Sequence, residues 1–160
     1  MRPAFGGIDF GTSNSTVGVV RNGQPRLVAL EDGQVTLPSA VFFNFEDNRT
    51  CFGRHAIANY TDSIEGRLMR SLKSVLGSSL AHEKTRIKSR SIGFMEIVGL
   101  FLGHLRKKLE EDAGDVVEMR VAYYNVTDVL LLPAAACHRK ASGIECNGVV
   151  NDKACKMLAR

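Results

Sequence analysis

Residues 7–20 read GIDFGTSNSTVGVV, and this stretch decides the fold. Apolar residues on both sides of a short polar segment are typical of two β-strands joined by a turn. We expect the first strand over residues 5–10. The second is expected over residues 15–21, where three valines supply the β-branched side chains that strands favour. The polar residues between the two strands form the predicted turn.

A second hairpin follows directly in the sequence. Asn22-Gly23 is a strong signal for a two-residue β-turn, because both residue types tolerate a positive φ. A third strand is predicted over residues 25–30, and another turn over residues 31–33, which read Glu-Asp-Gly. The chain is therefore expected to open with three antiparallel strands.

Residues 36–43 read TLPSAVFF and predict a further strand. Pro38 imposes an extended conformation on the residue before it, and the strand is expected to continue to Phe45. A short return strand is predicted over residues 50–52. From Gly53 onward, apolar residues recur at helical spacing and indicate a short helix.

The middle of the chain carries two longer segments with helical periodicity. Over residues 62–76, apolar residues recur at three- and four-residue steps and predict a helix that stops at Gly77. The polar and basic residues 80–91 are expected to form a loop or a weak hairpin. Residues 94–111 carry a continuous apolar stripe and are the strongest predicted helix. A last strand is predicted over residues 116–126.

The predicted turn between the first two strands has groups that suit phosphate. Gly11 lets the backbone approach a ligand closely, and successive backbone N–H groups in such a turn form a nest for anionic oxygen. Thr12 and Ser13 add hydroxyl groups. Asp9, at the end of the first strand, is placed to hold a magnesium ion through water. The residue chemistry alone leaves a second reading equally open, a polar hairpin tip that binds nothing.

GIDFGTSNSTVGVV resembles the opening of DnaK-type heat-shock chaperones, whose first phosphate motif has the form G-I-D-[LF]-G-T-[TS]-N-S-x-V. TLPSAVFF resembles their T-x-P-S-x-V-x-F strand. Residues 52–56, FGRHA, are similar to [IF]-G-x-x-A, and residues 71–77, SLKSVLG, are similar to A-K-R-L-[IL]-G. The YegD-like branch is the most similar, since its helix reads R-x-x-x-S-L-K-S-x-L-G. The four motifs occur in the family's order, and the resemblance covers residues 5–114.

The resemblance implies an α/β fold, the first-lobe fragment of an actin-like (ribonuclease H-like) ATPase. That fold has a mixed sheet with N-terminal antiparallel hairpins and packed helices. It also implies ATP and Mg as cofactors, with Asp9 near the magnesium-bound phosphates and Lys73 as the catalytic lysine that orients the attacking water and the γ-phosphate. Four residues are expected to line the phosphate loop: Gly11, Thr12, Ser13 and Asn14.

The resemblance fades after residue 117. We therefore divide the chain into residues 1–117, the front part of a DnaK-type nucleotide-binding domain, and residues 118–160, a divergent tail interpreted as frameshifted or truncated. No second phosphate loop of D-x-G-G-G-T type occurs in the sequence. The implied function is an ATP-binding and ATP-hydrolysing chaperone of the stress response, with unfolded proteins as clients of the full-length protein. This chain alone is expected to have weak activity or none.

Two other readings stay open. One is a sugar- or acetate-type kinase of the same superfamily, which also opens with a D-x-G-T hairpin but lacks TLPSAVFF and SLKSVLG. The other is a degenerate actin-like module without enzymatic activity, whose turn binds nothing. A nucleotide-binding measurement separates this last reading from the first.

Composition narrows the classes of partner. The 160 residues are 44% hydrophobic and 24% charged, as in globular proteins with a proper core. The net charge of +4 is mild and no dense lysine–arginine block occurs, so nucleic acid is not an expected partner. The most apolar late run, residues 97–105, is too short to span a bilayer. With no signal-peptide pattern either, we expect a cytoplasmic protein without a membrane partner.

The cysteines give no sign of a metal site. Their spacing does not match that of metal ligands, and free thiols are expected at all four positions: Cys51, Cys137, Cys146 and Cys155.

Overall fold

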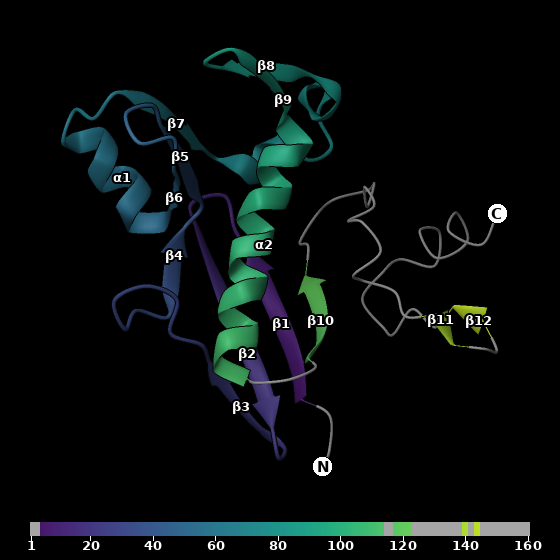
Figure 1. Cartoon of the computed structure of the whole chain (residues 1–160). Helices are drawn as coiled ribbons and strands as arrows, with labels where there is room; N and C mark the ends of the chain where they lie inside the picture. The colour runs from purple at the N-terminus through teal and green to yellow at the C-terminus, as the bar shows by residue number, and fades with distance from the viewer. Residues whose placement is uncertain (1–3, 114–116, 123–138, 141–142, 145–160) are drawn as a thin grey trace.

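The computed structural model describes residues 4–113, 117–122, 139–140 and 143–144. Its larger sheet has the strand order β10-β1-β2-β3, and β4 also pairs with β2 (Figure 1). The strands of this sheet are β1 (Ala4–Phe10), β2 (Asn14–Arg21), β3 (Gln24–Leu27), β4 (Thr36–Pro38) and β10 (Val117–Ala122). β1 pairs antiparallel with β2 and parallel with β10, so the sheet is mixed, as predicted.

The opening hairpins form where the sequence predicts them. Asn22 and Gly23 have φ angles of 53° and 79°, which matches the positive φ that a tight hairpin turn of this kind requires at both central residues. The third strand is shorter than predicted and ends at Leu27, although the N–H of Val28 still donates to the carbonyl of Val17 at 2.8 Å. The next turn, over residues 31–33, is confirmed by an isolated bridge between Glu31 and Gln34.

A smaller sheet has the order β6-β5-β7 and is covered by the helix α1. Its elements are β5 (Ala40–Asn44), β6 (Thr50–Phe52), β7 (Gly66–Arg70) and α1 (Gly53–Thr61). The segment TLPSAVFF is not one strand, because the chain leaves the larger sheet at Ser39 and enters the smaller one at Ala40. Ser39 therefore marks the passage between the two sheets.

The prediction of a helix over residues 62–76 is wrong. The segment instead forms β7 and a short 3-10 helix, η1 (Leu72–Val75), separated by Ser71 in the left-handed conformation with a φ of 55°. β7 pairs with all five residues of β5, from Ala40↔Arg70 to Asn44↔Gly66. This long-range pairing outweighs the local helical spacing, since tertiary context overrides propensity.

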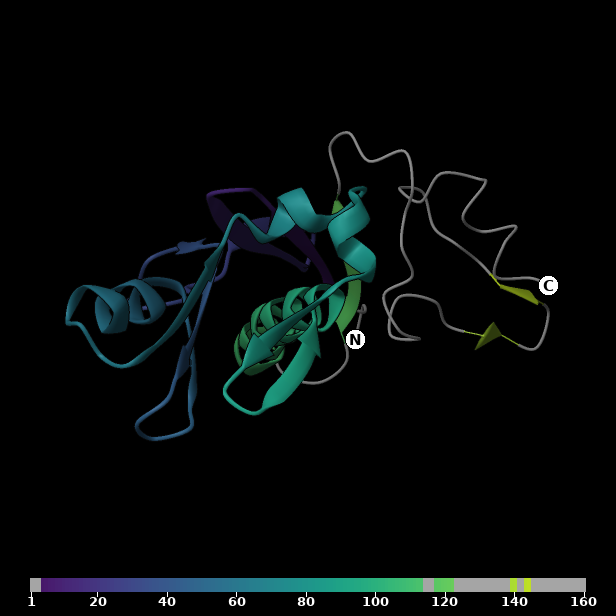
Figure 2. The same ribbon diagram turned by 90° about the horizontal axis from the view of Figure 1, so that it is seen from above.

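The rest of the described chain follows the prediction closely. A second 3-10 helix, η2 (Ser79–His82), precedes the hairpin of β8 (Lys84–Ile87) and β9 (Arg90–Gly93). The predicted long helix is α2 (Phe94–Ala113), which lies along one face of the larger sheet (Figures 1 and 2). The residues of its apolar stripe are buried in the core. A two-residue pair, β11 (Arg139–Lys140) with β12 (Gly143–Ile144), completes the described elements.

One core joins α2 to the larger sheet. The ring of Phe10 lies 5.8 Å from that of Phe101, and the core extends to Leu72 of η1. The described helices include none that is long and apolar enough to cross a membrane. Cys51 is a free thiol, as predicted, while the predictions for Cys137, Cys146 and Cys155 lie outside the described residues.

Candidate phosphate-binding turn

The turn between β1 and β2 is anchored by the core and exposed at its tip. Strand alternation buries Ile8 and Phe10 under α2 and leaves Asp9 exposed on the opposite face of the sheet. On the other side of the turn, Ser15 is buried and pairs with Phe10. The side chains between these anchors that were predicted to meet phosphate are all exposed: Thr12, Ser13 and Asn14.

Glycine is the only residue type that the turn can accommodate at the position of Gly11. A Cβ atom there would lie 2.2 Å from the backbone oxygen of Asn14, far inside contact distance. The backbone folds back on itself at this point, and a side chain would force the turn open. The glycine that the sequence motif contains is therefore required by close backbone approach.

The inner side of the turn is held by Ser39. Its hydroxyl donates to the carbonyl oxygen of Gly11 at 2.8 Å, and its backbone N–H donates to the carbonyl oxygen of Ser13 at 2.8 Å. The hydroxyl of Ser15 lies 2.9 Å from that of Ser39. Two carbonyl groups of the turn are thus bound by the residue that lies between β4 and β5. In the sequence, Ser39 is marked only by its place in the motif TLPSAVFF.

The outer side of the turn offers donors without acceptors. Within the described part of the chain, the backbone N–H groups of Thr12 and Ser13 donate to no backbone or side-chain oxygen. Exposed N–H groups next to hydroxyl side chains form the kind of concave donor set that accepts anionic oxygens. The arrangement suits a phosphate group better than a cation, and Asp9 is the acidic side chain closest to it along β1.

Lys73 lies on η1, at the end of the smaller sheet. Leu72 beside it is buried and anchors η1 in the core, while Lys73 itself is half-buried. Both views place η1 next to the turn between β1 and β2 (Figures 1 and 2). Among the described residues, the Lys73 ammonium forms neither an ion pair nor a hydrogen bond. The fold therefore brings η1, the element that carries Lys73, to the neighbourhood of the turn.

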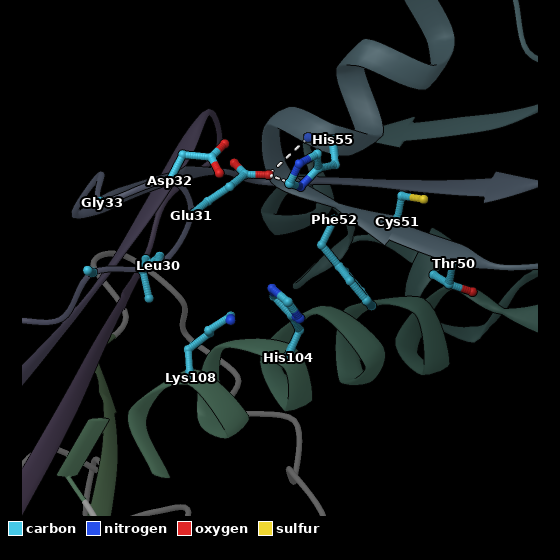
Figure 3. Close-up of a pocket in the computed structure, with 11 residues that line it drawn as sticks. Leu30, Glu31, Asp32, Gly33, Thr50, Cys51, Phe52, His55, His104 and Lys108 are labelled. Atoms are coloured by element: carbon cyan, nitrogen blue, oxygen red, sulfur yellow. Dashed lines mark hydrogen bonds and ion pairs between the residues drawn. The ribbon is translucent and has the colours of Figure 1, made fainter. Parts of the chain in front are cut away.

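A pocket of about 490 Å³ opens elsewhere, between the β3–β4 connection, β6 and α2 (Figure 3). None of the residues predicted for the phosphate site lines it. Its central group is Glu31, whose carboxylate accepts hydrogen bonds from the backbone N–H groups of Arg54 at 2.8 Å and His55 at 2.9 Å. The carboxylate also lies 2.9 Å from the imidazole Nδ1 of His55. Sequence reasoning missed Glu31, which it treated only as part of a turn.

Glu31 supplies the cap that α1 lacks. Phe52, at the N-cap of the helix, has no side-chain acceptor, and Gly53 enters the helix with a φ of +63°. The Arg54 guanidinium also links α1 to the β3–β4 connection and β4. It lies 3.4 Å from the Glu31 carboxylate and donates to the carbonyl oxygen of Thr36 at 2.6 Å. The sequence FGRHA is therefore a structural joint between α1 and the β3–β4 connection.

His104 closes the floor of the same pocket. Its ring stacks on that of Phe52 with 4.4 Å between the centroids and 13° between the planes. Burial lowers the pKa of His104 below its ordinary value of 6.5, and the positive charge of Lys108 lowers it further. A neutral imidazole packed on an aromatic ring serves the core, and within the described residues no group of three metal-binding side chains is found.

Comparison with known proteins agrees with the motifs. The family model described as Hsp70 protein matches residues 5–100. The chaperone protein DnaK of Mycoplasmopsis agalactiae is 31% identical over 160 residues, an alignment that covers 96% of this chain and 25% of that protein. The chain thus spans a quarter of the length of this curated relative. A match over more than half of the chain, on a mixed α/β fold of the first-lobe type, shows that the chain belongs to the Hsp70 family.

Proposed function

We propose that this chain contains the first phosphate-binding loop of an ATP-dependent, Hsp70-type chaperone. The proposal is supported by the turn of residues 11–14. Ser39 binds the carbonyl groups of Gly11 and Ser13 on the inner side of this turn. The N–H groups of Thr12 and Ser13 have no acceptor in the described chain. A donor set of this kind recognises the phosphate oxygens of a nucleotide.

Each predicted residue has a role in this proposal. Gly11, Thr12, Ser13 and Asn14 surround the phosphates with backbone and side-chain donors. Asp9 holds the magnesium ion through water, because its carboxylate is exposed at the end of β1. Lys73 brings a positive charge to the γ-phosphate and orients the attacking water. Bound magnesium would neutralise phosphate charge at this turn; the Asp9 carboxylate is the oxygen ligand type that such an ion takes, while the N–H groups would meet the phosphate oxygens.

The proposal extends to the whole protein. We infer that residues 1–117 are the front part of a nucleotide-binding domain and that residues 118–160 are a divergent tail. In a complete Hsp70-type protein, ATP and ADP would be the ligands, unfolded proteins the clients, and the cytoplasm the site of action during the stress response. This chain alone has one phosphate motif in its sequence, so we expect weak ATP binding and negligible hydrolysis.

Two measurements on the purified chain test the proposal. Calorimetric titration with Mg–ATP should detect weak binding in the natural chain and none in Gly11→Ala, because the added Cβ would clash with the Asn14 carbonyl oxygen and force the turn open. Gly99→Ala is the matched control, because nothing lies within 4 Å of the Cβ it would introduce. Phosphate release from Mg–ATP should be negligible, and turnover at the rate of an intact chaperone would contradict the expected inactivity. If the natural chain does not bind Mg–ATP at all, the degenerate module is the better reading.

A further inference from the structure

Ser39 makes three contacts to the turn between β1 and β2. Its hydroxyl meets Gly11 and Ser15, and its N–H meets Ser13, at distances between 2.8 and 2.9 Å. Only 2% of Ser39 and 1% of Ser15 are exposed, so water does not compete for these groups. Since Ser39 is neither on β1 nor on β2, it fixes the turn from outside, as a brace.

The chemistry of the hydroxyl group fixes the direction of these bonds. A serine hydroxyl has a single proton, and the Ser39 proton goes to the Gly11 carbonyl because that oxygen can only accept. The Ser15 hydroxyl must therefore donate to the Ser39 oxygen. The result is a one-way chain from Ser15 through Ser39 to Gly11, and each hydroxyl in it uses its proton.

Orienting a carbonyl also orients the N–H group of the following residue, because the peptide bond is planar and trans. The Gly11 carbonyl and the Thr12 N–H belong to one peptide plane. Binding the carbonyl toward Ser39 therefore turns the Thr12 N–H to the opposite, exposed side. The Ser13 carbonyl, bound by the Ser39 N–H, fixes the Asn14 N–H in the same way.

We propose that Ser39 is the positioning residue of the phosphate turn: its hydroxyl sets the peptide plane between Gly11 and Thr12 so that the Thr12 N–H faces the phosphate oxygens. This inference rests on the proposed function for the identity of the ligand. The orientation of the peptide plane does not depend on that function and can be measured without a nucleotide.

The test compares Ser39→Ala with Ser15→Ala. The two variants remove the same atom from equally buried positions, but only Ser39→Ala releases the Gly11 carbonyl. We expect Ser39→Ala to weaken Mg–ATP binding by about tenfold and Ser15→Ala to change it by less than about twofold. Thermal unfolding of both variants verifies that each is folded. Equal affinity of Ser39→Ala and the natural chain, or equal loss in both variants, would overturn the assignment.

Amide NMR spectra without nucleotide give the second readout. In Ser39→Ala, the chemical shift of the Thr12 amide should move further from that of the natural chain than in Ser15→Ala; equal spectra of the turn would overturn the assignment even if the natural chain binds no nucleotide. Absence of binding in the natural chain, with a displaced Thr12 amide in Ser39→Ala, would support the brace and contradict the proposed function. If Ser39→Ala does not fold, Ser39→Cys replaces it, because its thiol is a weaker donor of similar size and should displace the amide less.

Discussion

In the described part of the chain, two places present a glycine followed by N–H groups that the backbone itself leaves without an acceptor, and they differ in what binds these groups. At the turn of residues 11–14, the N–H groups of Thr12 and Ser13 meet no acceptor in the described chain. At the start of α1, the N–H groups of Arg54 and His55 are bound by the carboxylate of Glu31. The first place is open to an anion from outside, while the second carries its own anion.

This difference explains why two similar sequence landmarks have different consequences. GIDFGTSN and FGRHA both appear as family motifs, but the second is satisfied within the fold. Its substitution should change stability and leave ligand binding to the turn intact. Substitutions around the turn should instead change ligand binding and leave stability intact.

The largest expected effect is that of Gly53→Ala. The introduced Cβ would lie 2.2 Å from Leu37 Cδ1 and 2.9 Å from Glu31 Oε2, at a φ of +63°. Left-handed strain and overpacking together should lower the free energy of unfolding by about 4 kcal/mol. Urea denaturation measures it. Gly33→Ala is the control, since it has a φ of +77° with nothing within 4 Å and should cost only about 1 kcal/mol. Equal losses would show that packing against Glu31 and Leu37 is unimportant.

Glu31→Ala should have the next largest effect. It leaves two helix N–H groups without their acceptor and removes the carboxylate that pairs with the Arg54 guanidinium, and only 6% of the Glu31 side chain is exposed. The free energy of unfolding should fall by about 3 kcal/mol. In the exposed pair of Arg106 and Glu110, Glu110→Ala should change it by less than about 0.5 kcal/mol. If Mg–ATP affinity fell as steeply as stability in Glu31→Ala, the two places would not be independent.

Lys73→Ala sharpens the comparison from the side of the turn. The lysine forms no ion pair among the described residues, so its loss should leave the unfolding midpoint almost unchanged. Mg–ATP affinity should fall by about tenfold, as expected for a lost charge–phosphate contact. Lys107→Ala, which removes an exposed ammonium 3.9 Å from Glu111, is the control and should bind normally. Normal binding by Lys73→Ala would remove this residue from the site.

The smallest effect is a pH dependence on the side of the second place. The pKa of His104 is lowered by burial and by Lys108 and Lys107, against Glu31 and Glu111, which raise it. Below pH 6.5 the unfolded chain therefore binds a proton at His104 more readily than the folded chain does. The free energy of unfolding consequently falls as the pH falls. Above pH 6.5 this contribution is constant. His104→Phe keeps a ring on Phe52 and should flatten the slope of thermal midpoint against pH; an unchanged slope would assign it to other groups.

Sequence patterns predicted the parts of this fold that are decided locally. The Asn22-Gly23 turn and α2 follow from turn chemistry and a long apolar stripe. β7 was missed because its half-buried residues Leu68 and Met69 also fit a helical spacing, and only pairing with β5 decides between the two. The residues of the candidate site were identified by motif. The roles of Ser39 and Glu31 were not, because they depend on which segments meet in three dimensions.

The parallel pairing of β1 with β10 has a consequence for biosynthesis. Ala4 pairs with Val117 and Asp9 with Ala122, partners that are separated by most of the described chain. One edge of β1 must therefore wait, unpaired, until translation has delivered β10, and such distant contacts form slowly. An open edge is the feature that nascent chains aggregate through. β1, which ends at Phe10, is therefore synthesised well before the strand that completes its pairing.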